Sequence, residues 1–284
     1  MSGTDRIATQ RRAAIDQWPD YDWTRATWET GAFHDVLVLA GQAVARITRS
    51  SFAAEAMEQR VEVLERLEGR IGQFAVPTVL SDVRRWASES AGVLCGYVRG
   101  SSAERPEDPV AELNRVVDTI HQADSSLFAG TEVRSWCGGP DFPRLVSDHV
   151  IPLLDDDAAT AAADVVDQLL EAEASAPSCV VHGDLNSFNL RWEADVAYGV
   201  IDWDFAAVSD PALDIAGILS TLGLHVAAGL TDADTLRRAS KHRATFPLQI
   251  ACAGLLHDDR RLFDTGIRNF TERHHSGLLH YPGP

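Results

Sequence analysis

Apolar positions in the first third of the chain follow two different spacings. Residues 34–39 and 43–48 are strand-like runs joined by a short Ala-Gly-Gln connection, which predicts a β-hairpin. A further extended run covers 92–98. Residues 5–18 and 52–69 instead repeat their apolar side chains at the spacing of a helix, with Gly near the end of the second segment. The pattern therefore predicts a small sheet accompanied by helices.

Helical spacing dominates the rest of the chain. A loop rich in Ser, Glu and Pro covers 101–109, and one compact strand-rich region covers 178–205. The remaining segments with helical spacing are 109–122, 143–154, 158–172, 211–222, 233–255 and 258–270. We therefore expect an α+β chain of two lobes: an N-terminal lobe over 1–95 with a small β-sheet, and a larger, mainly helical lobe over 96–284. The chain would cross between them once, near residue 96.

Composition excludes several classes of protein. Of the 284 residues, 45% are apolar and 24% are charged, which is ordinary for a globular protein and unlike a disordered or disulfide-scaffold chain. No apolar run approaches the roughly 20 residues of a membrane span, and the N-terminus has no apolar core of a signal peptide. The four cysteines form no CxxC pair. We expect free thiols and a cytoplasmic protein.

The net charge of −17 is unevenly distributed. Residues 1–95 hold 11 basic and 13 acidic side chains, whereas residues 96–284 hold 14 and 29. Nucleic acid and anionic membranes are therefore not expected partners, because both require basic surface. The acidic lobe would attract a cationic ligand, or it serves solubility alone. Lys241 is the only lysine, so a cation in the N-terminal lobe has to be arginine.

The densest group of chemically useful side chains lies between residues 180 and 204. His182-Gly-Asp184 is followed by Asn189, and Asp202 stands in an Ile-Asp-Trp-Asp sequence. Asp184 would lie in a loop, free to accept a proton from a hydroxyl. The alternative is a loop whose Asp and Asn side chains only stabilise turns.

A hairpin is expected to bring the last two of these residues together. Strand-like residues 190–193 and 198–201 flank a turn at 194–197, which would place Asn189 opposite Asp202, with Cβ atoms about 5 Å apart. An amide oxygen and a carboxylate are hard donors that suit Mg²⁺. A base and two magnesium ligands are groups that phosphoryl transfer requires.

These motifs resemble those of the aminoglycoside phosphotransferase and choline kinase-like family, whose members share the two-lobed protein kinase fold. The resemblance implies that Asp184 orients and deprotonates the acceptor hydroxyl, and that Asn189 and Asp202 bind Mg²⁺. It also implies ATP or GTP as the phosphoryl donor. The family's Asp-Pro-x-x-Asp stretch is present from Asp210 to Asp214. The resemblance implies that Asp214 holds the catalytic loop, and capping of a helix by Asp210 is compatible with it.

The same resemblance assigns the N-terminal hairpin to nucleotide binding. Arg46 stands where kinases place a lysine on the third strand, and arginine also binds phosphate oxygens. Arg49 is an alternative phosphate-binding residue. The other alternative is that Arg46 is an ordinary solvent-facing arginine. The glycine-rich loop is nearly absent, with only Gly31 and its two neighbours before the first strand.

A glutamate on the helix at 52–69 is expected to pair with the phosphate-binding arginine. Glu58 lies beside the apolar face and is favoured, whereas Glu55 and Glu62 point further out; a solvated glutamate is the alternative. The backbone at Cys95 and Tyr97 would meet adenine or guanine at the hinge.

Within the family, the C-terminal helices and the Asp-Trp-Asp block are most similar to phosphotransferases of viomycin and capreomycin. We therefore expect phosphorylation of a cationic peptide antibiotic or an aminoglycoside, giving resistance, with Asp204 facing the substrate. The alternatives are a macrolide phosphotransferase, a metabolic kinase of choline, another amino alcohol or a sugar, and a non-catalytic pseudokinase that holds a nucleotide.

Two clusters outside these motifs have weaker signals. Three acidic residues at 155–157 are interpreted as a helix N-cap cluster. His274, His275 and His280 resemble a metal cluster by composition, but their spacing fits no metal-ligand pattern well. We therefore interpret them as part of a flexible tail.

Overall fold

The computed structural model describes residues 3–87 and 90–280. The chain divides into two units, of which the first comprises residues 1–99 with the short segment 199–201, and the second comprises 100–198 and 202–284. This division follows the change from strand-like to helical spacing in the sequence. Within the described residues, no helix combines the length and apolar character needed to cross a membrane.

The first unit is built on one antiparallel sheet with strand order β1-β2-β3-β5-β4. Its elements are α1 (Gly3–Gln17), η1 (Trp23–Arg25), β1 (Thr27–Thr30), β2 (His34–Leu39), β3 (Ala43–Thr48), α2 (Ser51–Leu67), β4 (Arg84–Ala87) and β5 (Ser90–Gly96). The hairpin β2–β3 confirms the expected pairing, with Leu39 opposite Ala43. The edge strands β1 and β4 are too short and too polar for the apolar pattern to indicate them.

Two apolar layers stabilise this sheet. Trp18, which directly follows α1, and Trp23 in η1 pack with Leu37 and Ile47 in one buried cluster. Helix α2 has the apolar face that its spacing predicts, including the buried Met57. Ser50 caps α2 by accepting a hydrogen bond from the Ala53 N–H at 3.1 Å. The cap explains why the helix starts at this point.

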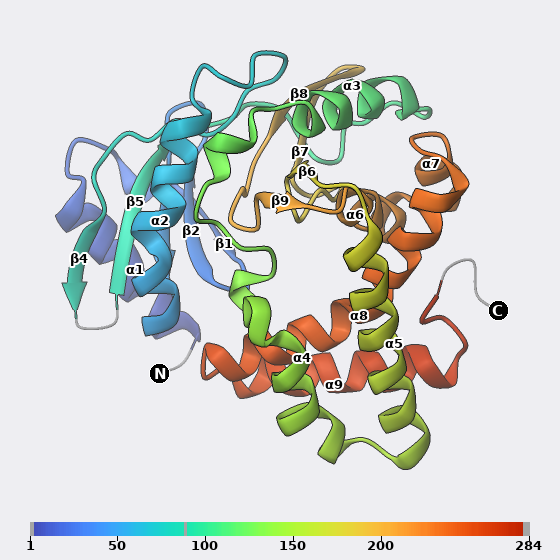
Figure 1. Ribbon diagram of the computed structural model, residues 1–284. Helices are drawn as coiled ribbons and strands as arrows, with labels where there is room; N and C mark the ends of the chain where they lie inside the picture. The colour runs from blue at the N-terminus through green and yellow to red at the C-terminus, as the bar shows by residue number, and fades with distance from the viewer. Residues whose placement is uncertain (1–2, 88–89, 281–284) are drawn as a thin grey trace. The chain divides into compact units, whose positions relative to one another are not determined.

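The second unit is mainly helical and carries two small β-structures, β6–β9 and β7–β8. Its α-helices and strands are α3 (Val110–His121), α4 (Phe142–Leu145), α5 (Asp156–Ser175), β6 (Cys179–Val181), β7 (Leu190–Glu193), β8 (Val196–Val200), β9 (Ala207–Ser209), α6 (Ala212–Leu222), α7 (Leu224–Ala228), α8 (Ala233–Leu256) and α9 (Arg260–His275). Helices α5, α8 and α9 pack together, and α6 packs on α8 (Figure 1).

Two expectations for this unit were wrong in detail. The segment 143–154 is not one helix: after α4 it continues as a π-helix, η5 (Val146–Val150), and ends as a 3₁₀ turn, η6 (Ile151–Leu153). Pro152 has no N–H to continue the helical hydrogen bonds. The β7–β8 hairpin has a shorter turn, because β8 begins at Val196. Strand β8 ends at Val200, so Asp202 lies two residues beyond the end of the strand.

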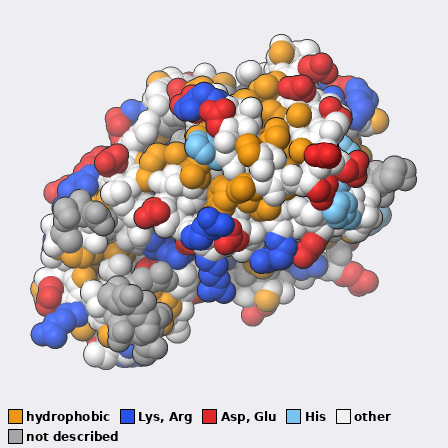
Figure 2. Space-filling view, turned by 90° about the horizontal axis from the view of Figure 1, so that it is seen from below, with side chains coloured by type: hydrophobic (Ala, Val, Ile, Leu, Met, Phe, Trp, Pro, Cys, Tyr) orange, Lys and Arg blue, Asp and Glu red, His pale blue; other side chains and the backbone are white. Residues whose placement is uncertain are grey.

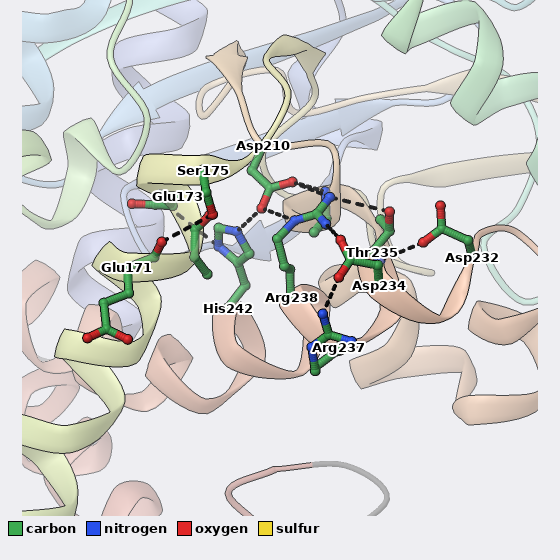
Figure 3. A network of polar contacts seen from close by, with 12 residues as sticks. Glu171, Glu173, Ser175, Asp210, Asp232, Asp234, Thr235, Arg237, Arg238 and His242 are labelled. Atoms are coloured by element: carbon green, nitrogen blue, oxygen red, sulfur yellow. Dashed lines mark hydrogen bonds and ion pairs between the residues drawn. The ribbon is translucent and has the colours of Figure 1, made fainter.

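A buried ionic network joins the start of α6 to α8 (Figure 3). Asp210 accepts hydrogen bonds from Arg238 Nε at 2.9 Å and from the Ala212 N–H at 2.9 Å. His242 Nε2 lies 3.4 Å from the same carboxylate. Burial alone would raise the pKa of Asp210, but the bonds from His242, Arg238 and Ala212 outweigh it and lower the pKa. The network fixes the position of the first turn of α6, the helix that carries Asp214.

Candidate active site

The His-Gly-Asp motif lies in the loop between β6 and β7. His182 is fully buried, and its ring packs against Trp203 with centroids 4.7 Å apart. The His182 Nδ1 atom accepts a hydrogen bond from the backbone N–H of Asp184 at 3.2 Å. Gly183 has φ +82°, and a Cβ there would lie 2.3 Å from the Phe205 carbonyl oxygen. Only glycine fits at this point, so the loop conformation follows directly from the motif.

Asp214 holds this loop from α6, as the family resemblance implied. Its carboxylate is fully buried and accepts the backbone N–H of His182 at 3.0 Å and of Gly183 at 2.9 Å. His121, at the end of α3, places its Nε2 atom 3.1 Å from Asp214 Oδ2, the same oxygen that accepts the His182 N–H. Because three separate elements meet at one carboxylate, the position of the motif is set by the core of the unit.

Two asparagines hold the carboxylate of Asp184. Asn186 Nδ2 donates to Oδ1 at 2.8 Å, and Asn189 Nδ2 donates to Oδ2 at 3.0 Å and to the main-chain oxygen at 2.8 Å. Burial raises the pKa of Asp184, while the electrostatic interaction with the nearby His182 ring and the two amide hydrogen bonds partly oppose the increase. The result is a fixed carboxylate whose proton affinity is higher than that of an ordinary aspartate. Such a group suits general-base chemistry.

Asn186 is a site residue that the sequence interpretation missed. Its Oδ1 atom accepts the Phe188 N–H at 2.8 Å while its Nδ2 holds Asp184. One side chain therefore shapes the loop and orients the base. A polar residue two positions after an aspartate is a common turn signal, so the spacing alone does not distinguish this role from simple turn formation.

The chemistry of Asn189 and Asp202 fits a divalent cation. The Asn189 amide nitrogen is used on Asp184, which leaves its oxygen as the group available to a metal. Asp202 is exposed and has φ 63°, a conformation that costs a non-glycine residue about 1–3 kcal/mol and that concentrates at functional sites. Both donors are hard oxygens, as Mg²⁺ requires.

In the first unit, the expected partner of Arg46 proves to be wrong. Glu58 on α2 forms a bidentate ion pair with Arg85 on β4, at 2.6–2.7 Å. The side chain of Arg46 on β3 instead lies 3.2 Å from His34 Nδ1. The edge strand β4 was not predicted, so the arginine that competes for Glu58 could not be anticipated.

Arg49, the alternative phosphate-binding arginine, has a structural role. Arg49 donates to the carbonyl oxygens of Gly31 and Ala32, which form the turn before β2, and its Nε lies 3.9 Å from Asp35. These contacts hold the segment that stands in place of a glycine-rich loop. Arg46 therefore remains the candidate for phosphate binding.

The hinge residues are integrated into the sheet. Cys95 is buried in β5 opposite Val44. The Tyr97 N–H approaches the Gln42 carbonyl at 3.4 Å, and the Gly96 N–H donates to Thr78 at 2.8 Å. Their contact with a nucleotide base stays a prediction.

Asp204 lies differently from the expectation. Its side chain is only 3% exposed, next to the buried Trp203, and its main-chain oxygen accepts the Trp136 indole N–H at 3.2 Å. In this structure its carboxylate is not offered to a substrate at the surface. The alternation of buried and exposed positions after β8 could not be inferred from the motif.

We expect Asn186→Ala to shift the pH dependence of activity. Loss of its hydrogen bond removes one of the interactions that lower the pKa of Asp184, so this pKa rises further. The protonated, inactive acid then persists to higher pH, and the acid limb of the kcat/KM profile moves upward. A matched control is Asn269→Ala on α9. An unchanged acid limb in Asn186→Ala would show that Asn186 does not tune the base.

Comparisons with known proteins identify the family of the chain. The model of the phosphotransferase enzyme family (APH) matches residues 30–245. Viomycin phosphotransferase of Streptomyces vinaceus is 27% identical over 264 residues, which cover 84% of this chain and 90% of that protein.

Solved structures confirm the expected fold class. The GDP complex of wild-type aminoglycoside 2'-phosphotransferase-IIIa gives a TM-score of 0.74 at 18% identity, over 97% of this chain and 99% of that one. Macrolide 2'-phosphotransferase type I gives 0.65 at 20% identity, over 95% and 98%. The family match, which spans most of the chain, shows that this protein belongs to the phosphotransferase enzyme family.

Proposed function

We propose that this chain transfers the γ-phosphoryl group of ATP or GTP to a hydroxyl of a cationic antibiotic. The acceptor would be a tuberactinomycin peptide such as viomycin or capreomycin, or an aminoglycoside. The observation that carries the proposal is the carboxylate of Asp184, oriented by Asn186 and Asn189 in a loop that Asp214 holds. Membership of a phosphotransferase family and similarity to a viomycin phosphotransferase support the reaction and the acceptor.

Asp184 has the chemistry to act as the base. It accepts the proton of the acceptor hydroxyl while the new oxygen–phosphorus bond forms and the bond from the γ-phosphorus to the nucleoside diphosphate breaks. Its raised pKa increases its affinity for that proton. The two amide donors keep the carboxylate in one orientation, so less reorganisation is needed in the transition state.

Separate groups would bind the donor. Asn189 and Asp202 are the proposed ligands of Mg²⁺, which when bound would offset negative charge on the phosphates. Arg46 is proposed to bind phosphate oxygens, and the backbone near Cys95 and Tyr97 to contact the base.

Asp202→Asn should weaken nucleotide binding only when Mg²⁺ is present. Loss of one negative ligand lowers the affinity for the metal, and with it the metal-dependent part of nucleotide affinity. Calorimetric titrations with ADP in Mg²⁺ and in EDTA separate the two contributions. Equal affinities of the variant and the wild type in Mg²⁺ would remove Asp202 from the proposed metal site.

The acceptor class is tested by kinetics at two ionic strengths. Acidic and basic side chains are interspersed on the face seen in Figure 2, whereas residues 96–284 together carry 14 basic and 29 acidic side chains. If these acidic side chains recruit the acceptor, the KM of viomycin or capreomycin rises with salt. A salt-independent KM together with a higher kcat/KM for a macrolide would favour the macrolide phosphotransferase alternative. A preference for choline or a sugar would favour a metabolic kinase.

A further inference from the structure

The acidic residues at 155–157 and two of the C-terminal histidines lie next to each other in the second unit. Asp155 and Asp157 lie at the start of α5, whereas His274 and His275 form the last turn of α9. These two helices pack against each other. The histidines are therefore ordered on a helix instead of lying in a flexible tail, and residues far apart in sequence become neighbours. Histidine and acidic side chains are also adjacent on the face of the molecule drawn in Figure 2.

The atoms of this group are close enough to share one ion. His274 Nε2 lies 2.7 Å from Asp157 Oδ2, and His275 Nε2 lies 3.5 Å from Asp155 Oδ2. One ligand atom each from Asp157, His274 and His275 lies within 4.8 Å of the others. Around a tetrahedral Zn²⁺, ligand atoms bound at about 2.0–2.2 Å lie roughly 3.3–3.6 Å from one another. The observed spacing needs only small side-chain rotations to reach that arrangement.

The start of α5 and the end of α9 both favour a site in which carboxylates surround a cation. The positive end of the α5 dipole stabilises the carboxylates, and the negative end of the α9 dipole stabilises a cation. Asp155 is already the N-cap of α5, because its Oδ1 accepts the Ala158 N–H at 2.9 Å. Asp157 does not cap the helix, and its side chain is 82% exposed. Adjacent histidines on a helix usually diverge, yet here both imidazoles reach the same acidic turn.

We propose that Asp157, His274 and His275 form a binding site for a divalent transition-metal ion of the Zn²⁺ type, with water completing the coordination. Two imidazoles and one carboxylate select such ions over Mg²⁺ and Ca²⁺, which prefer oxygen donors alone. The bound ion would link the start of α5 to the end of α9. This site contains none of the residues proposed above for phosphoryl transfer, so it is independent of that function.

The alternative arrangement is a pair of His–Asp ion pairs without a metal. The two differ in a measurable way, because a metal requires neutral imidazoles and displaces their protons. Co²⁺ reports the difference directly, since ligation by imidazole in a tetrahedral site produces a visible absorption band far more intense than the weak band of octahedral aqueous Co²⁺.

The test is a Co²⁺ titration of tag-free protein, followed by displacement with Zn²⁺. We expect one equivalent of Co²⁺ to develop the band in the wild type, Asp157→Asn to weaken binding by at least about tenfold, and His274→Ala/His275→Ala to abolish it. His149→Ala, at an exposed histidine outside the group, and Asp202→Asn, in the proposed Mg²⁺ site, should titrate like the wild type. Zn²⁺ should raise the urea midpoint of the wild type and of these two controls, but not that of the double histidine variant.

Two results would overturn the proposal. One is the absence of a Co²⁺ band in the wild type up to millimolar metal, which would leave ion pairing as the sole role of the cluster. The other is an unchanged titration of the double histidine variant, which would place the bound metal elsewhere. Neither result bears on phosphoryl transfer, because the readout is metal binding and not activity.

Discussion

Asp184→Asn is expected to lower kcat by roughly 10²–10⁴-fold, the usual contribution of a general base. The variant keeps the size of the side chain but removes the group that accepts the proton. Nucleotide affinity should change little, because Asp184 is not among the proposed donor ligands. Steady-state kinetics with the preferred acceptor measure kcat, and calorimetry with ADP measures nucleotide binding.

The matched control for this variant is Asp195→Asn, at an exposed aspartate in the turn between β7 and β8. It removes the same charge at a short sequence distance without touching the loop, so its kcat should stay near that of the wild type. If Asp184→Asn retained kcat within a few-fold of the wild type, Asp184 would not be the base. A wild-type protein that binds nucleotide and never turns over would instead support the pseudokinase alternative.

Arg238→Met is expected to lower the free energy of unfolding by about 3–5 kcal/mol. The guanidinium is buried and bonds to the buried carboxylate of Asp210. Methionine fills similar space but leaves a charge in the core that only His242 and one backbone N–H then oppose. Urea denaturation at neutral pH measures the loss.

Arg260→Met provides the control for the buried pair. Arg260 and Asp264 form an ion pair with both side chains largely exposed, at 80% and 49%, and such pairs contribute about 0–1 kcal/mol. Equal losses in the two variants would contradict the importance of the buried network. If Arg238→Met failed to fold, Arg238→Lys should recover part of the stability. Lysine restores the positive charge but not the pair of guanidinium hydrogen bonds to Asp210.

The pH dependence of this effect has a definite sign. The pKa of Asp210 is lowered in the folded protein, so its contribution to stability is present above the ordinary aspartate pKa of about 4 and is lost as pH falls through the lower, folded pKa. The difference between Arg238→Met and the wild type should therefore shrink in acid.

Local patterns were sufficient for much of the fold and for the core of the site. The β2–β3 hairpin follows from two strand-like runs, and α2 follows from its helical apolar spacing and the Gly near its end. The His-Gly-Asp loop could be located from its motif and the spacing to Asn189, and the structure shows that Gly183 has the positive φ that this loop requires. The role of Asp214 followed from the family resemblance and is confirmed by its two bonds to backbone N–H groups.

The remaining features depend on contacts between distant segments. Glu58 pairs with Arg85 because β4 joins the sheet edge, and nothing in the spacing around Glu58 indicates that strand. Asp157 and His274 meet because α5 and α9 pack together. The orientation of Asn186 is set by the closed loop around it. Such pairings are decided by tertiary packing, which a single sequence does not display.

The central claim is that this chain phosphorylates a hydroxyl of a cationic antibiotic with Asp184 as the base. Its most direct test is mass spectrometry of the acceptor after incubation with Mg²⁺ and ATP or GTP, across viomycin, capreomycin, aminoglycosides, a macrolide and choline. We expect a phosphorylated cationic antibiotic with the wild type and almost none with Asp184→Asn. Phosphate on the macrolide or choline alone, or equal product from both proteins, would contradict it.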